Sequence, residues 1–207
     1  MKPKRYTWPE IRKLAEDFRA IYVSPPDKIP VPIEEIVEFG LGLEIVPIDR
    51  LKSTIDVDGF LSNDLKTIYV DKQVYYEEKY ISRLRFTLAH EVAHFVLHED
   101  VIKNSKFRTF EDWIHFREEL PEEKLIWFEQ QAYEFAGRLL VPIEGLIIAL
   151  VEQREKIETY KSHDVSNEND ERLIDAISKV MCDKFRVSPT VIYKRIRSEK
   201  LWDELNF

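Results

Sequence analysis

The residues whose types and spacing could do chemistry lie in the segment 85–98, which reads RFTLAHEVAHFVLH. His90 and His94 are four positions apart, so on a helix they would share one face, with β-carbons about 5–6 Å apart. At that separation both imidazoles can reach one zinc ion (Zn2+) at about 2.0–2.1 Å. Glu91 would lie beside them, where it can take a proton from a water at the metal. Because zinc lowers the pKa of such a water from about 15.7 toward about 7, the pattern indicates hydrolysis, most naturally of a peptide bond.

The surroundings of this polar trio favour a metal over ordinary core histidines. The neighbouring positions are apolar on nearly every side of the helix: Leu84, Phe86, Leu88, Ala89, Val92, Ala93, Phe95, Val96 and Leu97. Such a helix is buried, and a buried polar group without a partner costs roughly 1–3 kcal/mol. Two histidines and a glutamate therefore need a shared explanation, which zinc provides. The alternative is a pair of histidines satisfied by hydrogen bonds alone.

A catalytic zinc site usually needs a third protein ligand. On the helix predicted over residues 122–140, Glu129 falls within the apolar face, whereas Glu134 points to the opposite side with Gln131 and Arg138. A carboxylate on a buried helix face needs a cation, so we expect Glu129 to complete the site. The alternative is a carboxylate at the rim of that face, paired with an arginine.

Two residues beyond the second histidine are rival ligands. Asp100 falls where a longer motif, His-Glu-x-x-His-x-x-Gly-x-x-His, has its third histidine, but Leu97 replaces the glycine that turns the chain there. His98 lies one helical turn past the motif, too far along the axis for good tetrahedral geometry, so we expect it beside the site or at its rim. His115 and His163 lie in polar segments and are expected at the surface.

Several further elements must position the proposed zinc helix, which is predicted over 82–98. Apolar periodicity predicts other helices over 7–22, 33–39, 111–118, 122–140, 143–156 and 170–185, and from 189 onward. Thr7 and Glu10 match a capping box for the first helix, and Ser188 is the expected cap of the last. Residues 49–58 and 158–169 are predicted to be loops.

Strands are predicted over 43–48, 59–62 and 67–71. Three short strands cannot form an independent core, so the sheet must lie against helices. We therefore expect an α+β fold, mainly helical, with a small three-stranded sheet packed beside the zinc-binding helix. Residues 1–157 are expected to form the catalytic domain, and 158–207 a C-terminal helical part packed on it.

Composition narrows the class of protein. The net charge of −8 disfavours a dedicated nucleic-acid binder, whose affinity would depend on Lys and Arg contacts to phosphates. With one cysteine, Cys182, no internal disulfide is possible, which fits a reducing cytoplasm. No apolar run follows the basic start or reaches the roughly 18 residues of a membrane span. We expect a cytoplasmic protein without a signal peptide.

Two blocks together resemble the ImmA/IrrE family of zinc metallopeptidases. The first is RFTLAHEVAH at 85–94, and the second has the pattern ExxAxxFAxxLLVP at 129–142. Shorter landmarks lie at 29–33, 59–61 and 185–189, so the resemblance spans about residues 10–198. It implies a gluzincin-like core in which His90, His94 and Glu129 hold zinc and Glu91 is the general base.

The same resemblance implies the kind of substrate. It implies action on a DNA-binding repressor protein or an antitoxin-like regulator. From the composition, we expect no direct contact to nucleic acid or membrane. Ala93, Tyr133 and Val141 replace the family's usual glycine, asparagine and methionine. The gap between the two blocks is long, which fits an inserted segment at 99–121. This segment is either a lid over the site or a segment that packs on the fold without a functional role. Tyr133 and His115 are candidates for stabilising the oxyanion.

Three other functions remain open from the sequence. One is a toxin-like member of a two-gene toxin–antitoxin module. Another is a DNA-associated regulator without peptidase activity, since Lys194, Arg195 and Arg197 fall on the last predicted helix. A closed structural zinc site is disfavoured, because such sites are rich in cysteine.

Overall fold

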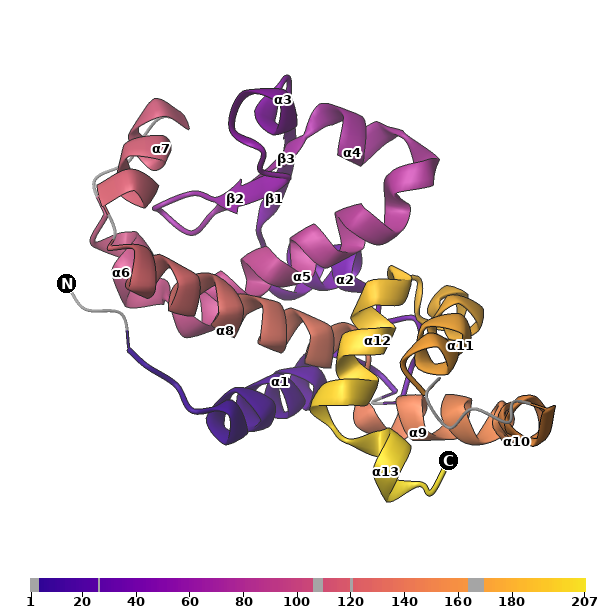
Figure 1. The fold of residues 1–207 in the computed structure, drawn as a ribbon. Coiled ribbons are helices and arrows are strands. Elements are labelled where there is room, and N and C mark those ends of the chain that lie inside the picture. The colour runs from indigo at the N-terminus through magenta and orange to yellow at the C-terminus, as the bar shows by residue number, and fades with distance from the viewer. Residues whose placement is uncertain (1–3, 26, 106–109, 120, 164–169) are drawn as a thin grey trace.

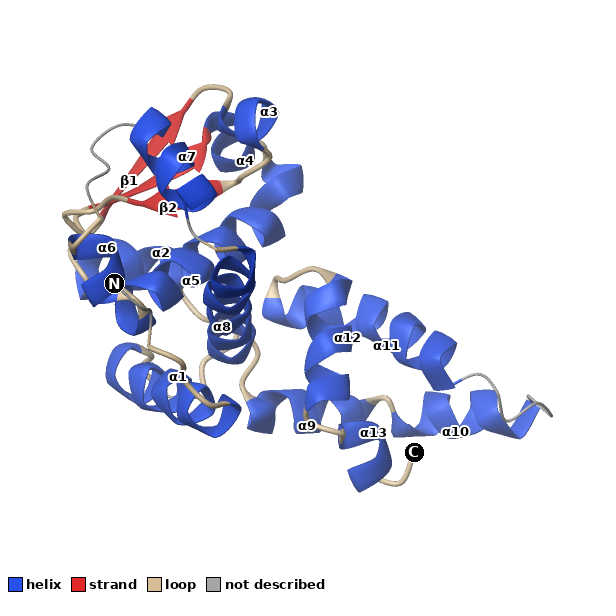
Figure 2. Cartoon of the chain, turned by 60° about the vertical axis from the view of Figure 1, so that its left-hand side comes forward, coloured by secondary structure: helices blue, strands red, loops and turns tan. Residues whose placement is uncertain are grey.

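The chain folds into a mainly helical structure with one small sheet at one end (Figure 1, Figure 2). The computed structural model describes residues 4–25, 27–105, 110–119, 121–163 and 170–207. The α+β class expected from the sequence is confirmed. No helix within those ranges is long and apolar enough to cross a membrane.

Two long helices form the centre of the fold. α5 (Ile81–Leu97) and α8 (Glu122–Leu140) pack side by side. Both helices completely bury small residues, among them Ala93 on α5 and Ala136 on α8. Small side chains allow helix axes to approach closely, so side chains of α5 and α8 can meet at one site.

α1 (Trp8–Tyr22) packs against α8 as well. The expected capping box is present: the Glu10 N–H donates to Oγ1 of Thr7 at 3.4 Å, and the Thr7 N–H donates to Oε2 of Glu10 at 2.7 Å. Phe18 of α1 meets Phe135 of α8 edge-on, with ring centroids 5.8 Å apart. α8 is therefore covered by more than one helix.

The sheet has the order β1-β3-β2 and lies beside α5, as expected. β1 (Glu44–Ile48) runs parallel to the central β3 (Thr67–Asp71), and β2 (Gly59–Leu61) runs antiparallel to it. A Cβ added at Gly59 would lie 2.6 Å from Cγ2 of Thr87 on α5. Glycine is therefore what allows β2 to come so near the helix.

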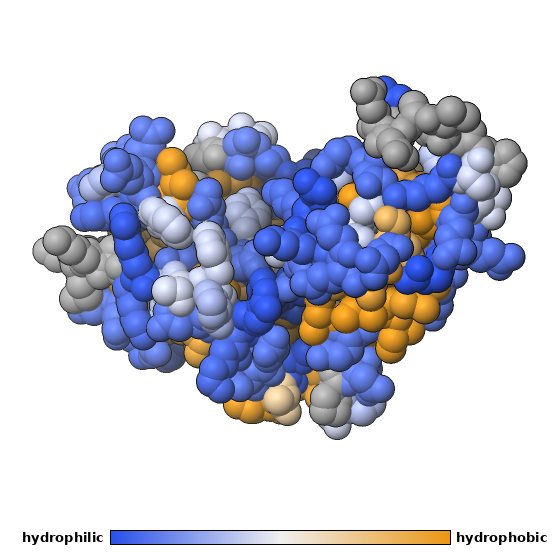
Figure 3. Space-filling view, turned by 60° about the horizontal axis from the view of Figure 1, so that its bottom comes forward, coloured by the Kyte–Doolittle hydropathy of each residue, from blue (hydrophilic) through white to orange (hydrophobic). Residues whose placement is uncertain are grey.

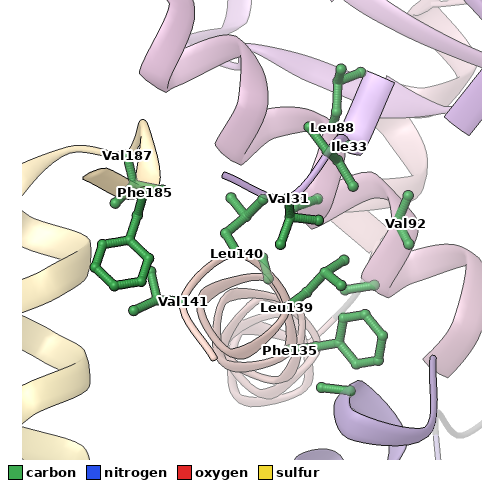
Figure 4. Packing of buried hydrophobic residues seen from close by; sticks show 14 of the residues in the cluster. Val31, Ile33, Leu88, Val92, Phe135, Leu139, Leu140, Val141, Phe185 and Val187 are labelled. Atoms are coloured by element: carbon green, nitrogen blue, oxygen red, sulfur yellow. The ribbon is translucent and has the colours of Figure 1, made fainter. Parts of the chain in front are cut away.

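A continuous core joins these central helices to distant parts of the chain. Figure 4 shows apolar side chains of α5, α8, the segment near Val31 and the turn after Phe185 within one view. Arg85 of α5 is buried and donates to the carbonyl oxygens of Val31 at 2.6 Å and Arg186 at 3.1 Å. It thus connects the first motif block to two of the other landmarks seen in the sequence.

Five helices follow α8 in the described chain: α9 (Ile143–Glu152), α10 (Arg154–His163), α11 (Asp170–Phe185), α12 (Pro189–Ser198) and α13 (Leu201–Glu204). Glu199 follows α12 and pairs with Arg195 of that helix, and it connects this C-terminal region to α1 and α8 by ion pairs to Arg12 and Arg138. Burial alone would raise the pKa of Glu199, but the charges of these arginines hold it below its ordinary value. The boundary expected at residue 157 lies inside α10, and the two-part division stays a prediction.

Several short helices differ from the sequence expectations. The segment 49–58 contains α3 (Leu51–Ile55), so the prediction of a loop over this whole segment was wrong. Its caps, Arg50 and Asp56, both have left-handed backbones with φ of 65° and 56°. Neither is a glycine, so nothing in the sequence marks these ends. The expected helix 33–39 is α2 (Ile33–Glu35) continued by the π-helical η1 (Ile36–Gly40).

The expected loop at 158–169 was wrong in its first part, because α10 continues through residue 163. Ile157 is fully buried and anchors this helix, and Arg154 pairs with Glu158 at 3.6 Å. The rest of that loop, 164–169, lies outside the described residues. The expected short helix near 111–118 is present as α7 (Phe110–Glu119). Three unexpected short helices are α4 (Lys72–Tyr76), η2 (Glu78–Tyr80) and α6 (Glu99–Lys103).

The face turned forward in Figure 3 is largely hydrophilic, with its widest apolar area to the right of the centre and smaller apolar areas elsewhere. On α9, Ile148 and Val151 are exposed. Apolar side chains are a normal part of the surface of folded proteins, and the site described next lies elsewhere.

Candidate metal centre

Three donor atoms from α5 and α8 converge on one point. Nε2 of His90 lies 3.0 Å from Oε2 of Glu129 and 3.0 Å from Nε2 of His94. Nε2 of His94 lies 3.9 Å from the same carboxylate oxygen. Within the described ranges, this is the group of three or more His, Cys, Asp or Glu donors that could hold a metal ion. The structure thus brings together the three ligands expected from the sequence.

These separations fit a metal ion bound by all three side chains. In a tetrahedral site with bonds of about 2.0–2.1 Å, two ligand atoms lie about 3.3 Å apart. The observed 3.0, 3.0 and 3.9 Å scatter around that value. The side chains of His90, His94 and Glu129 are 12%, 7% and 25% exposed, so the site is shielded but open on the carboxylate side. Two imidazoles and one carboxylate are a common ligand set for a catalytic metal.

Glu91 borders the same cleft without belonging to the donor group. It is buried on α5 between the two histidines and lines a cavity of about 500 Å³ that the three donors face. Its carboxylate is not among the atoms that lie within 4.8 Å of one another. This placement agrees with the expected role of Glu91 beside the metal, which stays a prediction.

His98 continues the cluster into the core. Its Nδ1 lies 2.9 Å from Nδ1 of His94, and its Nε2 lies 3.2 Å from Oε1 of Gln131. Phe128 stacks on both imidazoles, with centroids 4.4 Å from His94 and 4.0 Å from His98. Burial lowers the pKa of His98 to about 4, although the Gln131 hydrogen bond acts in the opposite direction. His98 is therefore neutral at pH 7.

One sequence expectation about this region holds in part, and another was wrong. His98 was expected beside the site or at its rim; it contacts His94, in agreement with the first alternative, and its exposure of 1% excludes the rim. Gln131 and Arg138 were assigned to the face of α8 opposite the apolar one, yet both are buried. The reason is that α8 is covered by several helices, so its apolar stripe is not its only buried face.

The other rival residues do not contribute donors. Asp100 is exposed in the first turn of α6. His115 is exposed on α7 and lies 3.5 Å from Glu118. His163 ends α10, and its side chain lies outside the described atoms. Neither Asp100 nor His115 is among the described residues that border the cleft.

Tyr133 lies one turn past Glu129 on α8 and borders the cleft. Its ring centroid is 4.6 Å from that of His90 and 5.7 Å from that of Phe86. Of the two candidates for stabilising an oxyanion, Tyr133 is therefore near the donors and His115 is not.

The cleft continues into a larger cavity of about 1080 Å³ that reaches α12. Four residues line both cavities: Asp58, Arg83, Phe86 and Tyr133. On the opposite side, Trp113 and Phe116 of α7 line the first cavity, and Trp113 packs on Phe60 of β2 with centroids 5.0 Å apart. The inserted segment thus borders the site, while its action as a lid stays a prediction.

Comparison with known proteins identifies one family. The model of a peptidase family described as the IrrE N-terminal-like domain matches residues 74–197, which is more than half of the chain. The match runs from α4 to α12 and includes both motif blocks. The landmarks at 29–33 and 59–61 lie outside it. None of the curated proteins matches the sequence.

Proposed function

The chain belongs to the peptidase family of the IrrE N-terminal-like domain, and on this premise we propose that it is a zinc-dependent endopeptidase. The observation that carries the proposal is the convergence of His90, His94 and Glu129 on one cleft beside Glu91. Zinc is favoured among metals because imidazole and carboxylate ligands in a three-protein-ligand site suit it.

The residues of the cleft supply the remaining chemistry. When bound, zinc would polarise the scissile carbonyl and make a water acidic enough to lose a proton near pH 7. Glu91 takes that proton as the water oxygen adds to the carbonyl carbon. It then gives the proton to the amide nitrogen as the carbon–nitrogen bond breaks, leaving a carboxylic acid and an amine. Glu91 begins and ends the cycle as a carboxylate.

Tyr133 is our candidate for stabilising the charge on the carbonyl oxygen. Phe86 and His90 pack against its ring, which restricts where its hydroxyl can lie. A tyrosine hydroxyl is a hydrogen-bond donor at neutral pH, and donors aimed at a developing oxyanion typically contribute about 10²–10³-fold to the rate.

An extended polypeptide fits the shape of the site. The Asp71 N–H donates to the Asp58 carbonyl, and the Ser62 N–H donates to the Thr67 carbonyl. In an antiparallel pair the residues between, Gly59 and Leu61, therefore direct their backbone groups away from β3. Both residues border the cleft, so a substrate strand can pair with the free edge of β2.

We further propose that the substrate is a regulatory protein, either a DNA-binding repressor or an antitoxin-like regulator. Support comes from the resemblance of the two motif blocks and from α7, whose aromatic residues line the cleft. The test is to incubate the zinc-loaded protein with such a regulator and with casein, and to measure fragments by mass spectrometry. Cleavage of the regulator at one site supports the proposal, whereas general digestion of casein contradicts it.

A DNA-associated regulator is the weaker alternative. Of the three cations on the last long helix, Arg195 is buried and pairs with Glu199 at 2.5 Å. Arg197 pairs with Glu171 at 2.9 Å. A recognition helix needs such side chains free to reach phosphates or bases, and here two of the three are already bound within the chain. Nothing in the described part of the chain favours a toxin-like function over the others, and a cytoplasmic location stays an expectation.

A further inference from the structure

A chain of three side chains leads from the core of α8 to the proposed metal site. Oε1 of Gln131 faces Nε2 of His98 at 3.2 Å, and Nδ1 of His98 faces Nδ1 of His94 at 2.9 Å. The last atom of the chain is Nε2 of His94, which faces Nε2 of His90 and Oε2 of Glu129. Every member is more than nine-tenths buried, so water is a poor substitute for any of these partners.

The donors and acceptors in this chain have one consistent arrangement. An amide oxygen only accepts hydrogen bonds, so Nε2 of His98 must carry the hydrogen that it donates to Gln131. A neutral imidazole has one N–H and one lone pair, which leaves Nδ1 of His98 as an acceptor. Nδ1 of His94 must then be the donor across the 2.9 Å contact. It follows that Nε2 of His94 carries a lone pair, as a metal ligand must.

We propose that Gln131 and His98 are positioning residues that hold His94 in its Nδ1–H tautomer and so direct the Nε2 lone pair at the metal. This inference rests on the proposed function, because the tautomer of His94 matters only if His94 binds a metal. The opposite orientation of the Gln131 amide would reverse every bond and place a hydrogen on Nε2 of His94, where it would block the ion. The orientation of one buried amide thus favours the tautomer of His94 in which Nε2 can bind the metal.

Packing keeps the two rings in this arrangement. Phe128 stacks on both imidazoles, with interplanar angles of 29° to His94 and 25° to His98. A rotation of the His98 ring would break both of its hydrogen bonds and disturb that stacking. Partners of this kind, outside the ligand set, typically contribute about 10–100-fold to metal affinity.

The first measurement needs no substitution and no metal. Long-range ¹⁵N–¹H NMR correlations of the metal-free protein at pH 7 distinguish the two neutral tautomers of each histidine ring. We expect His94 to carry its hydrogen on Nδ1 and His98 to carry its hydrogen on Nε2. The reverse pattern, or a mixture of tautomers at both residues, would overturn the proposal.

The second measurement compares variants at adjacent glutamines of α8. Gln131→Met removes the acceptor at similar volume, and Gln131→Glu keeps an acceptor at the same place. Gln130→Met is the matched control, because Gln130 is exposed on the same helix. By competition with a chelator we expect zinc affinity to fall about 10–100-fold in Gln131→Met, and to remain near the natural value in Gln131→Glu and Gln130→Met.

The outcomes separate this inference from the proposed function. Equal zinc affinity and equal tautomers in Gln131→Met and Gln130→Met would refute the positioning role even if the protein is an active peptidase. If the natural protein shows the expected tautomers but binds no zinc, the proposed function is refuted and the tautomer assignment still holds. If Gln131→Met does not fold, the tautomers of the natural protein still decide the assignment.

Discussion

Zinc should stabilise the folded chain through Glu129, because the ligands join α5 to α8 and this arrangement exists only in the native state. A ligand that binds only the native state adds RT ln(1 + [L]/Kd), or about 2.7 kcal/mol at a free concentration of 100 Kd. For a chain of this length, each kcal/mol added to the free energy of unfolding raises the melting temperature by about 2–4 °C. The melting temperature should therefore rise by about 5–11 °C when zinc is held at 100 Kd.

Glu129→Gln should remove most of this rise. An amide is a poorer zinc ligand than a carboxylate, and we expect the affinity to fall at least about 100-fold, beyond the effect of residues outside the ligand set. At the same zinc concentration the stabilisation is then about 0.4 kcal/mol, a rise of about 1–2 °C. Differential scanning calorimetry at buffered free zinc measures this directly.

Asp100→Asn is the control, since Asp100 is the exposed rival ligand. It should keep the full rise. If Glu129→Gln keeps the rise and Asp100→Asn loses it, the ligand assignment is wrong. Metal-free melting temperatures of both variants show whether either change affects the fold by itself.

Other consequences are open to simpler assays. Glu91→Gln should keep zinc and lose cleavage by about 10²–10⁴-fold; release of zinc from this variant would show that Glu91 is a ligand. Tyr133→Phe should lower kcat by about 10²–10³-fold with zinc content unchanged, and an unchanged kcat would remove Tyr133 from the chemistry. Glu199→Gln leaves Arg195 buried without its carboxylate partner and takes one of two carboxylates from Arg138, which keeps Glu134, and should cost about 3–5 kcal/mol in urea unfolding. Because the pKa of Glu199 is lowered in the folded state, its contribution is complete above the ordinary value of about 4.3. It should be lost as the pH falls through the folded value, and a pH-independent difference between this variant and the natural protein would contradict that account.

The long helices could be predicted from the sequence because their signals are strong. The helices at 122–140 and 170–185 have the same limits in the structure, since several turns of apolar periodicity and a proline near one end define them. α3, α4 and α6 have five residues each. A helix of about one and a half turns is too short to show an apolar periodicity in the sequence, and such helices depend on contacts with the rest of the fold.

The metal-donor residues could also be predicted from the sequence, whereas the residues that support them could not. His90, Glu91 and His94 form a local pattern, and Glu129 stands out as an acid on an apolar helix face. Gln131 is buried because α8 has several neighbours. Its partner His98 is 33 positions away in the sequence, so helical projection of either segment alone cannot pair the two residues.

The most direct test of the central claim is a crystal structure of the zinc-soaked protein with anomalous data at the zinc edge. The account predicts one strong peak about 2.0–2.2 Å from Nε2 of His90, Nε2 of His94 and a carboxylate oxygen of Glu129, with Glu91 beside it and not bound. A peak coordinated by Asp100, with Glu129 turned to an arginine, or no peak at these histidines at saturating zinc, would contradict it.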